Sequence, residues 1–245
     1  MKRTKVFAHR GFSGTAPENT MAAFEKALAA QADGIELDVH LSRDGHLIVM
    51  HDEKVDRTTN GSGWIKDLTL AELKQLDNGS WFGKDFENET IPTLAEVLER
   101  VKDSNLIVNI ELKNTLVPYS GLEQKVIREV ERFRMEDRVI LSSFRHDSLQ
   151  VVKKMNPSIQ VGALYSYGMV DPWVYAGYVG VDAIHPHFLA ATNDVIAGCH
   201  QHGIKVHPYT VNEEKEWKRL IRAGADAIIT NFPDRLRQLL SDQGK

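Results

Sequence analysis

Short runs of β-branched and other apolar residues alternate with amphipathic segments along almost the whole 245-residue chain. This alternation is typical of a parallel α/β fold, in which each strand is followed by a helix that packs on the sheet. Strands are predicted at 5–9, 34–41 with a hairpin-like extension at 46–51, 106–113, 138–144, 159–165, 182–186, 204–209 and 227–230. Helices are predicted near 19–31, 93–102, 120–134, 146–155, 171–178, 192–202, 213–223 and 233–241. Eight strand–helix units predict a TIM (β/α)8 barrel, and its closure is inferred from that count.

The segment 53–90 interrupts this rhythm. It contains turn signals at Asn60–Gly63 and Asn78–Ser80, one short helical pattern near 69–76, and no strand pattern. Connections in this class of fold usually have about 2–6 residues, so we interpret the segment as an insertion after the second strand. Because it follows the carboxyl end of a strand, where active sites of this fold lie, we expect it over the barrel mouth.

The length suits one barrel and is short for two ordinary domains, so residues 1–245 are expected to form a single domain. The net charge of −4 and the scattered basic residues argue against a nucleic-acid partner. No apolar run approaches the ~20 residues that span a bilayer, and the first residues lack the apolar core of a signal peptide. The single Cys199 cannot form an intrachain disulfide. We therefore expect a cytoplasmic protein without a membrane span. The sequence does not determine its oligomeric state.

Two helix starts can be predicted from capping boxes. Thr69 is followed three residues later by Glu72, and Thr93 is followed in the same way by Glu96. In a capping box the threonine and the glutamate satisfy each other's backbone N–H groups at the first turn. Helices are therefore expected to begin directly after Thr69 and Thr93.

Acidic side chains gather on one face of the second predicted strand. Side chains alternate across a strand, so Glu36 and Asp38 share a face while the apolar residues between them point the other way. Glu111 takes a similar place on the next predicted barrel strand. Three carboxylates from neighbouring strands suit Mg²⁺ or Ca²⁺, and no cysteine cluster argues for zinc. The alternative is a salt-bridged network in which these acids pair with Lys113 and Arg10.

Two of the ten histidines lie at predicted strand ends beside this acidic cluster. His9 closes the first strand and His51 closes the hairpin extension, so the pair is a candidate general acid and base near neutral pH. Arg10 offers a planar fork for phosphate oxygens, and Lys113 adds a point charge. Strand parity places His9 and Arg10 on opposite faces, so both reach one site only if the first strand ends between them.

A glycine-rich turn at 11–20 leads from the first strand into the first predicted helix. A helix N-terminus suits a phosphate, although this turn matches neither a P-loop nor a dinucleotide-binding motif. Glu18 follows Thr15 at capping-box spacing, which gives it a structural interpretation. The functional interpretation is an ion pair between Glu18 and Arg10.

Three longer motifs stand in a fixed order: AHRGFSGTAPENTMAAFEKAL (8–28), DGIELDVHLSRDGHLIVMHD (33–52) and NIELK (109–113). Five weaker stretches extend the pattern: WIKDLTLAELKQLDNGSWF, IPTLAEVL, LSSF, YTVN and AIITNFPD. In this combination the chain resembles the glycerophosphodiester phosphodiesterase family over nearly its whole length.

The resemblance implies an enzyme that hydrolyses a small-molecule glycerophosphodiester to sn-glycerol 3-phosphate and an alcohol. Glu36, Asp38 and Glu111 would hold one divalent cation, Mg²⁺ or Ca²⁺, which offsets charge on the phosphate. His9 and His51 would act as acid and base. One would activate the glycerol 2-hydroxyl for attack on phosphorus, and the other would protonate the leaving alcohol. A cyclic phosphate would form and then open.

The resemblance also implies residues that bind the substrate. Arg10 and Lys113 would clamp the phosphate, and the segment 53–90 would form a wall over the glycerol pocket. Three further residues are candidates for that pocket: Phe12, Glu18 and Tyr209. The sequence departs from the family at two positions, since Gln31 stands where Gly is usual and Tyr209 replaces a frequent Trp.

Alternative functions stay open. A barrel with similar chemistry could cleave lysophospholipids or a phosphoinositide, but it would need an apolar mouth, and the sequence shows no exposed apolar run or basic amphipathic helix. A non-catalytic phosphodiester-binding barrel, or a barrel isomerase or aldolase, would not need both histidines with all three carboxylates. The head group, the choice between Mg²⁺ and Ca²⁺, and the role in phosphate scavenging or lipid turnover are undetermined.

Overall fold

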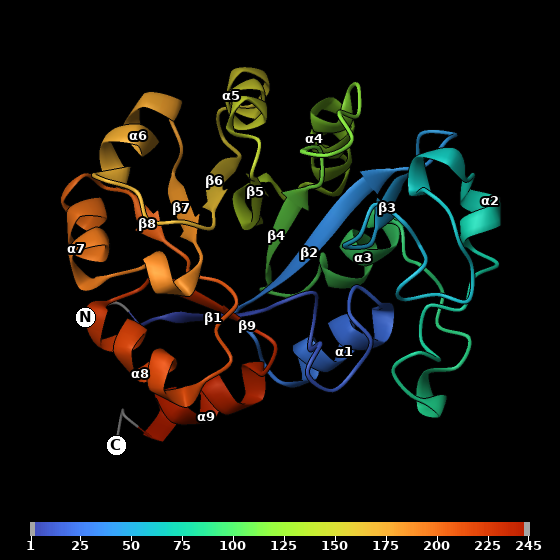
Figure 1. The fold of residues 1–245 in the computed structure, drawn as a ribbon, viewed down its shortest axis with the longest axis horizontal. Helices are drawn as coiled ribbons and strands as arrows, with labels where there is room; N and C mark the ends of the chain where they lie inside the picture. Colours follow the sequence, from blue (N-terminus) through green and yellow to red (C-terminus); the bar gives the residue numbers. More distant parts are fainter. Residues whose placement is uncertain (1–2, 243–245) are drawn as a thin grey trace.

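One parallel sheet rolled into a barrel forms the centre of the molecule (Figure 1), whose computed structural model describes residues 3–242. The barrel strands are β1 (Lys5–Ala8), β2 (Gly34–Leu41), β4 (Ile107–Leu112), β5 (Val139–Ser143), β6 (Gln160–Tyr165), β7 (Ala183–Pro186), β8 (Lys205–Val206) and β9 (Ala227–Thr230). Neighbours pair in parallel along the order β8-β7-β6-β5-β4-β2-β1-β9. The predicted hairpin-like extension is β3 (Leu47–Val49), which pairs antiparallel with β2.

β8 and β9 close the barrel through single backbone hydrogen bonds rather than a regular ladder. The carbonyl oxygen of Val206 accepts from Asp226 N at 3.1 Å. The carbonyl oxygen of Pro208 accepts from Ile229 N at 3.0 Å, and that of Ile229 accepts from Val211 N at 2.9 Å. β8 is shorter than the predicted 204–209 because Pro208 has no N–H to donate to a ladder. The predicted TIM barrel is confirmed.

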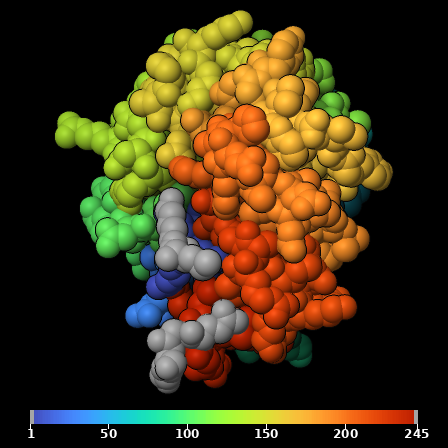
Figure 2. Space-filling view, turned by 90° about the vertical axis from the view of Figure 1, so that its left-hand side faces the viewer, coloured from blue at the N-terminus to red at the C-terminus, as the bar shows by residue number. Residues whose placement is uncertain are grey.

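Helices cover the outside of the barrel (Figure 1). They are α1 (Met21–Ala29), α3 (Leu94–Val101), α4 (Leu122–Phe133), α5 (His146–Met155), α6 (Pro172–Val179), α7 (Asn193–Gln201), α8 (Glu214–Ala223) and α9 (Pro233–Asp242). Figure 2 shows the face on which α6, α7 and α8, in orange to red, lie next to one another. Among residues 3–242, no helix has both the length and the apolar character needed to cross a membrane.

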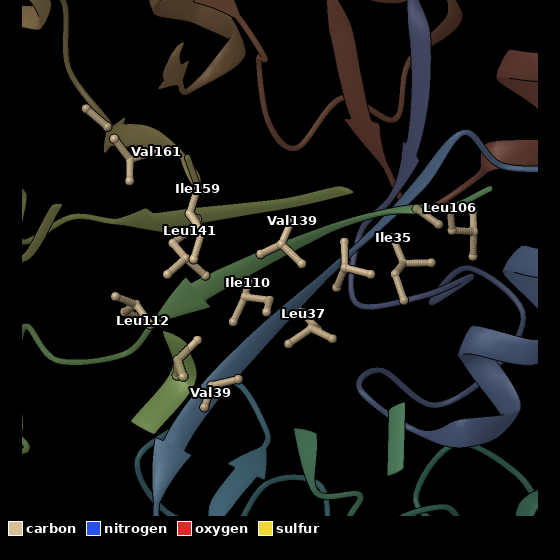
Figure 3. Close-up of a cluster of buried hydrophobic side chains, with 14 of the residues drawn as sticks. Ile35, Leu37, Val39, Leu106, Ile110, Leu112, Val139, Leu141, Ile159 and Val161 are labelled. Atoms are coloured by element: carbon tan, nitrogen blue, oxygen red, sulfur yellow. The ribbon is translucent and has the colours of Figure 1, made fainter. Parts of the chain in front are cut away.

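The main core lies between the strands and these helices. On β2, Ile35, Leu37 and Val39 are completely buried, and Figure 3 shows them beside apolar side chains from the neighbouring strands. They pack against the buried apolar faces of helices such as α3 and α4. Because side chains alternate along a strand, the polar residues between them face the barrel interior. This is the orientation that positions the site.

The helix starts follow the predicted caps with one exception. Both predicted capping boxes, at Thr69 and at Thr93, are present. Thr15 and Glu18 do not cap the first helix, because α1 begins later and Thr20 is its N-cap. The structural interpretation of Glu18 is therefore wrong, and this side chain is available for another role.

The segment 53–90 carries three short helical turns: η1 (Ile65–Asp67), α2 (Leu70–Leu73) and η2 (Lys84–Phe86). Its described residues add no regular strand. A small core of its own comprises Ile48, Met50, Val55, Ile65, Leu73 and Ile91. Since Ile48 belongs to β3, this core attaches the segment to the β2–β3 hairpin, at the right-hand edge of Figure 1.

Candidate active site

Glu36, Asp38 and Glu111 meet at neighbouring strands on the interior face of the barrel. The parallel register of β2 and β4 places Asp38 opposite Glu111, and Glu36 opposite Asn109. One oxygen from each of the three carboxylates lies within 4.8 Å of the others. Glu36 and Asp38 are buried, and the Glu111 side chain is only 12% exposed. The structure thus brings together the three acids that the sequence singled out.

Burial and mutual repulsion dominate the electrostatics of these acids. Burial and the charges of Asp38 and Glu111 raise the pKa of Glu36 well above its usual range. Burial also raises the pKa of Glu111, against the opposing charge of Lys113. Burial disfavours ionisation of Asp38 as well, but the charges of Lys113 and Arg10 hold the pKa of Asp38 below its usual range. The cluster therefore concentrates negative charge that a cation would relieve.

Two basic side chains neutralise part of this charge. Lys113 Nζ lies 3.0 Å from Glu111 Oε1 and 3.6 Å from Asp38 Oδ1, while Arg10 Nε lies 3.4 Å from Asp38 Oδ2. The salt-bridged network considered from the sequence is therefore partly realised. Even so, within the described part of the chain Asp38 Oδ1 is buried without a hydrogen-bond partner, which is costly for a carboxylate. A donor set made only of oxygen atoms, one of which lacks a hydrogen bond, fits Mg²⁺ or Ca²⁺.

His9 lies directly after β1, next to the acids. Its Nδ1 is 2.7 Å from Asn231 Oδ1, and with this amide orientation Nδ1 carries the proton and donates. The other ring nitrogen, Nε2, lies 3.9 Å from Glu36 Oε2 and 3.5 Å from Thr210 Oγ1. Burial and the adjacent Arg10 charge lower the pKa of His9 to about 4. At neutral pH His9 is thus a neutral imidazole with a lone pair on Nε2.

His51 has a different partner. Its Nδ1 is 2.7 Å from Asp52 Oδ1, and because a carboxylate only accepts, Nδ1 donates. The partner of His51 is a carboxylate, whereas the partner of His9 is a neutral amide. The two histidines therefore differ in the group that holds Nδ1, and in both of them Nε2 is the nitrogen left for chemistry.

The backbone conformation of Arg10 resolves the conflict of strand parity. β1 ends at Ala8, and Arg10 adopts a left-handed conformation with φ of 53°, which is uncommon for a residue other than glycine. Its N–H donates to Glu36 Oε2 at 2.9 Å, and its Nη1 donates to Glu18 Oε1 at 2.8 Å. The chain therefore turns between His9 and Arg10, so both reach the same site.

This constellation agrees with a sequence profile match. The profile of the Glycerophosphoryl diester phosphodiesterase family matches residues 9–235. The chain belongs to this family. It is therefore an enzyme of the phosphodiesterase class, and the resemblance drawn from its motifs is confirmed.

Relatives of known name and structure agree with this assignment. A glycerophosphodiester phosphodiesterase of Caldanaerobacter subterraneus is 48% identical over 242 residues, which cover 99% of this chain and 100% of the relative. One of Bacillus altitudinis is 46% identical, covering 95% and 96% of the two chains. An Oleispira antarctica phosphodiesterase solved with the product sn-glycerol-3-phosphate superposes with a TM-score of 0.87 at 33% identity, covering 98% and 97%.

Three residues at the site of this family member were not singled out from the sequence. Asn231 holds His9, Asp52 holds His51, and Arg57 from the segment 53–90 donates hydrogen bonds to Asp52. Asp52 could have been noted, since it directly follows His51 in the same motif. Asn231 gives no such signal, because it lies 222 residues from its partner.

Aromatic rings line the other side of the mouth, after the strands β5, β7 and β8. Tyr209 makes edge-on contacts with Phe144 and with His187, with ring centroids 6.1 Å apart in both pairs. Its hydroxyl donates to the Tyr165 carbonyl oxygen at 3.3 Å. Phe12 is not part of this wall, because it is 8% exposed and packs in the main core.

The other departure from the family pattern has a backbone explanation. Gln31 follows α1 with φ of 54°, in the left-handed region where glycine is usual at the end of a helix. Its carbonyl oxygen accepts a hydrogen bond from Arg237, and its N–H donates to the Leu28 carbonyl. Gln31 therefore takes the conformation that a glycine would take, and it lies outside the site.

Proposed function

We propose that this enzyme hydrolyses glycerophosphodiesters to sn-glycerol 3-phosphate and an alcohol by histidine acid–base catalysis at a divalent cation site. The observation that carries the proposal is the position of two histidines at the barrel end where Glu36, Asp38 and Glu111 converge. In each histidine Nδ1 is hydrogen-bonded to a neighbouring side chain. The product named in the Oleispira antarctica structure supports the choice of substrate.

Glu36, Asp38 and Glu111 are the residues that would hold the cation. A bound Mg²⁺ or Ca²⁺ would act as a Lewis acid and offset the negative charge that develops on the phosphate oxygens. Arg10 and Lys113 border the same carboxylates at 3.4 Å and 3.0 Å, so their positive charges can bind the remaining phosphate oxygens.

The partners of the two histidines support a division of roles. His9 is held by a neutral amide, so in the first step it accepts the proton of the glycerol 2-hydroxyl at Nε2. The ring of His51 is oriented by the Asp52 carboxylate, and in this proposal His51 donates a proton from Nε2 to the leaving alcohol oxygen. The 2-oxygen forms a bond to phosphorus while the bond to the alcohol breaks, which leaves a cyclic phosphate.

The second step opens the cyclic phosphate with water. His51 is now neutral and accepts a proton from the attacking water, while His9 returns its proton to the departing 2-oxygen. The products are sn-glycerol 3-phosphate and the restored pair of histidines. The segment 53–90 borders this site through Arg57, which supports its role as a wall over the glycerol pocket.

A second substrate class is favoured by one surface feature. The loop after β6 and helix α6 expose Tyr167, Val170, Val174 and Tyr178, with exposed fractions of 64% or more. The sequence has no continuous exposed apolar run here, but the fold brings these separated residues onto one segment of the surface. The loop follows the carboxyl end of β6, so Tyr167 and Val170 lie on the side of the mouth, where they could contact the acyl chain of a lysophospholipid.

The test is release of glycerol 3-phosphate from glycerophosphocholine, with lysophosphatidylcholine as the competing substrate. We expect hydrolysis to disappear with chelator and to return with Mg²⁺ or Ca²⁺. His9→Ala and His51→Ala should each lower turnover by ~10²–10⁴-fold. Full turnover in chelator or in either variant would refute the mechanism, and a preference for lysophosphatidylcholine would favour the second substrate class.

A further inference from the structure

Arg57 bridges two carboxylates at the edge of the site. It donates from Nε to Asp52 Oδ2 at 2.7 Å and from Nη2 to Asp52 Oδ1 at 3.0 Å. It also donates from Nη2 to Glu18 Oε1 at 2.7 Å and from Nη1 to Glu18 Oε2 at 3.1 Å. Both oxygens of each carboxylate thus bind one guanidinium, in the planar geometry that gives strong charge-assisted hydrogen bonds.

Each of these carboxylates continues to a residue of the proposed mechanism. Asp52 Oδ1 accepts from His51 Nδ1 at 2.7 Å, and Glu18 Oε1 accepts from Arg10 Nη1 at 2.8 Å. A continuous chain of hydrogen bonds therefore runs from His51 through Asp52, Arg57 and Glu18 to Arg10. It joins the proposed acid to the proposed phosphate ligand without passing through the cation site.

The main chain near Arg57 is fixed by the small core of the segment 53–90. Val55 is completely buried in that core, and its N–H donates to the Gly63 carbonyl oxygen at 3.0 Å. Lys54 and Trp64 form an antiparallel bridge beside it. The guanidinium is therefore presented to the site from a supported backbone rather than from a free loop.

We propose that Arg57 is a positioning residue, which fixes the His51 ring and the Arg10 guanidinium relative to each other and uses the segment 53–90 as its support. This inference rests on the proposed function. An isolated ion pair at a side chain that is 45% exposed contributes little to stability, because solvent screens it. Four hydrogen bonds to two carboxylates that each orient a site residue give Arg57 a role beyond stability. Without Arg57, Asp52 can turn away from His51.

A double-mutant cycle on kcat for glycerophosphocholine with Mg²⁺ tests this role. Arg57→Met and Asp52→Asn should each lower kcat by ~10–100-fold, the usual effect of losing a residue that orients a reacting group. If Arg57 acts through Asp52, kcat of the double variant should be no more than about threefold below kcat of the less active single variant. Losses that multiply, or an unchanged kcat in Arg57→Met, would overturn the proposal.

Arg43 provides a matched control. It also reaches residues of the segment 53–90, donating to the Asp67 carbonyl oxygen at 3.1 Å and to Glu72 at 3.2 Å. Its described partners are both in the segment 53–90 and outside the site, so Arg43→Met should change kcat less than about twofold. An equal loss in Arg43→Met and Arg57→Met would mean that the effect is a general loosening of the segment, and it would refute positioning.

Arg57→Lys separates geometry from charge and is available if the methionine variant does not fold. A lysine keeps the positive charge but cannot present two parallel hydrogen bonds to each of two carboxylates. We expect kcat of Arg57→Lys to stay at least ~10-fold below the unmodified enzyme. Full kcat in Arg57→Lys would refute the role of the planar guanidinium in bridging Asp52 and Glu18. If the unmodified enzyme itself releases no glycerol 3-phosphate, the proposed function is wrong. If the unmodified enzyme is active and substitution of Arg57 leaves kcat unchanged, only this inference is wrong.

Discussion

His40 donates a hydrogen bond from Nε2 to the backbone carbonyl oxygen of His51 at a distance of 3.1 Å. A carbonyl oxygen only accepts, so the proton of His40 lies on Nε2, and Nδ1 accepts from the Tyr119 hydroxyl at 3.2 Å. His51 is therefore held at its main chain by His40 and at its ring by Asp52. His40 is completely buried, which favours the neutral ring that this arrangement needs.

The first prediction is that His40 affects turnover through His51. His40→Leu removes the donor to the His51 carbonyl and should lower kcat by ~10–100-fold, with KM changed by less than about threefold. His40→Gln retains an N–H donor and should keep most of the activity. Steady-state kinetics on glycerophosphocholine would measure both values.

The control for this prediction is a similar arrangement elsewhere in the fold. His146 lies between the Tyr175 hydroxyl and the Leu164 carbonyl oxygen, at 2.8 Å from each. His146→Leu removes a comparable pair of hydrogen bonds at a partly buried ring that does not contact His51, so kcat should stay within about twofold. If His146→Leu and His40→Leu lower kcat equally, His40 has only a structural role.

The second prediction concerns the repulsion among the carboxylates. Since Glu36 is buried beside two like charges, Glu36→Gln should not destabilise the cation-free protein, and we expect a gain of about 0–2 kcal/mol in the free energy of unfolding. The same variant should lose the rise in melting temperature that Mg²⁺ or Ca²⁺ gives the unmodified protein. Thermal unfolding with and without the cation measures both effects, and the exposed Glu99→Gln is the control. A Glu36→Gln variant with unchanged cation stabilisation would remove Glu36 from the proposed ligands.

The third prediction concerns stability in acid. His185 lies buried on β7, and burial lowers its pKa from 6.5 to about 3. Above pH 6.5 the ring is neutral in both states, so it adds no pH dependence. Below pH 6.5 the unfolded chain binds a proton that the folded protein does not bind until about pH 3, so stability falls as the pH falls through this window.

Between pH 6.5 and about pH 4.5 this single group should cost about 3 kcal/mol, at 1.36 kcal/mol per pH unit. His185→Gln removes the titration, so its loss of stability between about pH 7 and pH 4.5 should be smaller by roughly that amount. Urea unfolding at both pH values measures the difference, with the half-exposed His46→Gln as control. Equal pH dependence in the unmodified protein and His185→Gln would contradict the prediction.

Periodicity was sufficient to predict most of the fold, because each element repeats one simple pattern. The strand predicted at 34–41 is observed as Gly34–Leu41, and the helix predicted at 146–155 as His146–Met155. The exception, β8, is shortened by Pro208, where the apolar pattern continues although the backbone cannot donate. Barrel closure depends on hydrogen bonds between distant segments, and no local pattern encodes them.

The site could be predicted from sequence only where a residue breaks the pattern of its own strand. Glu36 and Asp38 are visible because a buried strand rarely alternates with acids. Arg57 is not visible, because its partner Glu18 lies 39 residues away in the sequence. Phe12 packs in the main core, and a motif does not distinguish an aromatic ring that packs in the core from one that lines a pocket.

The last prediction concerns the head group and Tyr209. This ring contacts Phe144 and His187 in the loops that follow β5 and β7, and its hydroxyl donates to the Tyr165 carbonyl oxygen. An aromatic face attracts a quaternary ammonium group by about 0.5–2 kcal/mol, so Tyr209→Ala should raise KM for glycerophosphocholine by about 2–30-fold. KM for glycerophosphoglycerol, which has no cation, should rise much less, and Tyr209→Trp should restore the preference for choline. An equal rise in KM for both substrates would show that Tyr209 supports the mouth without recognising the head group.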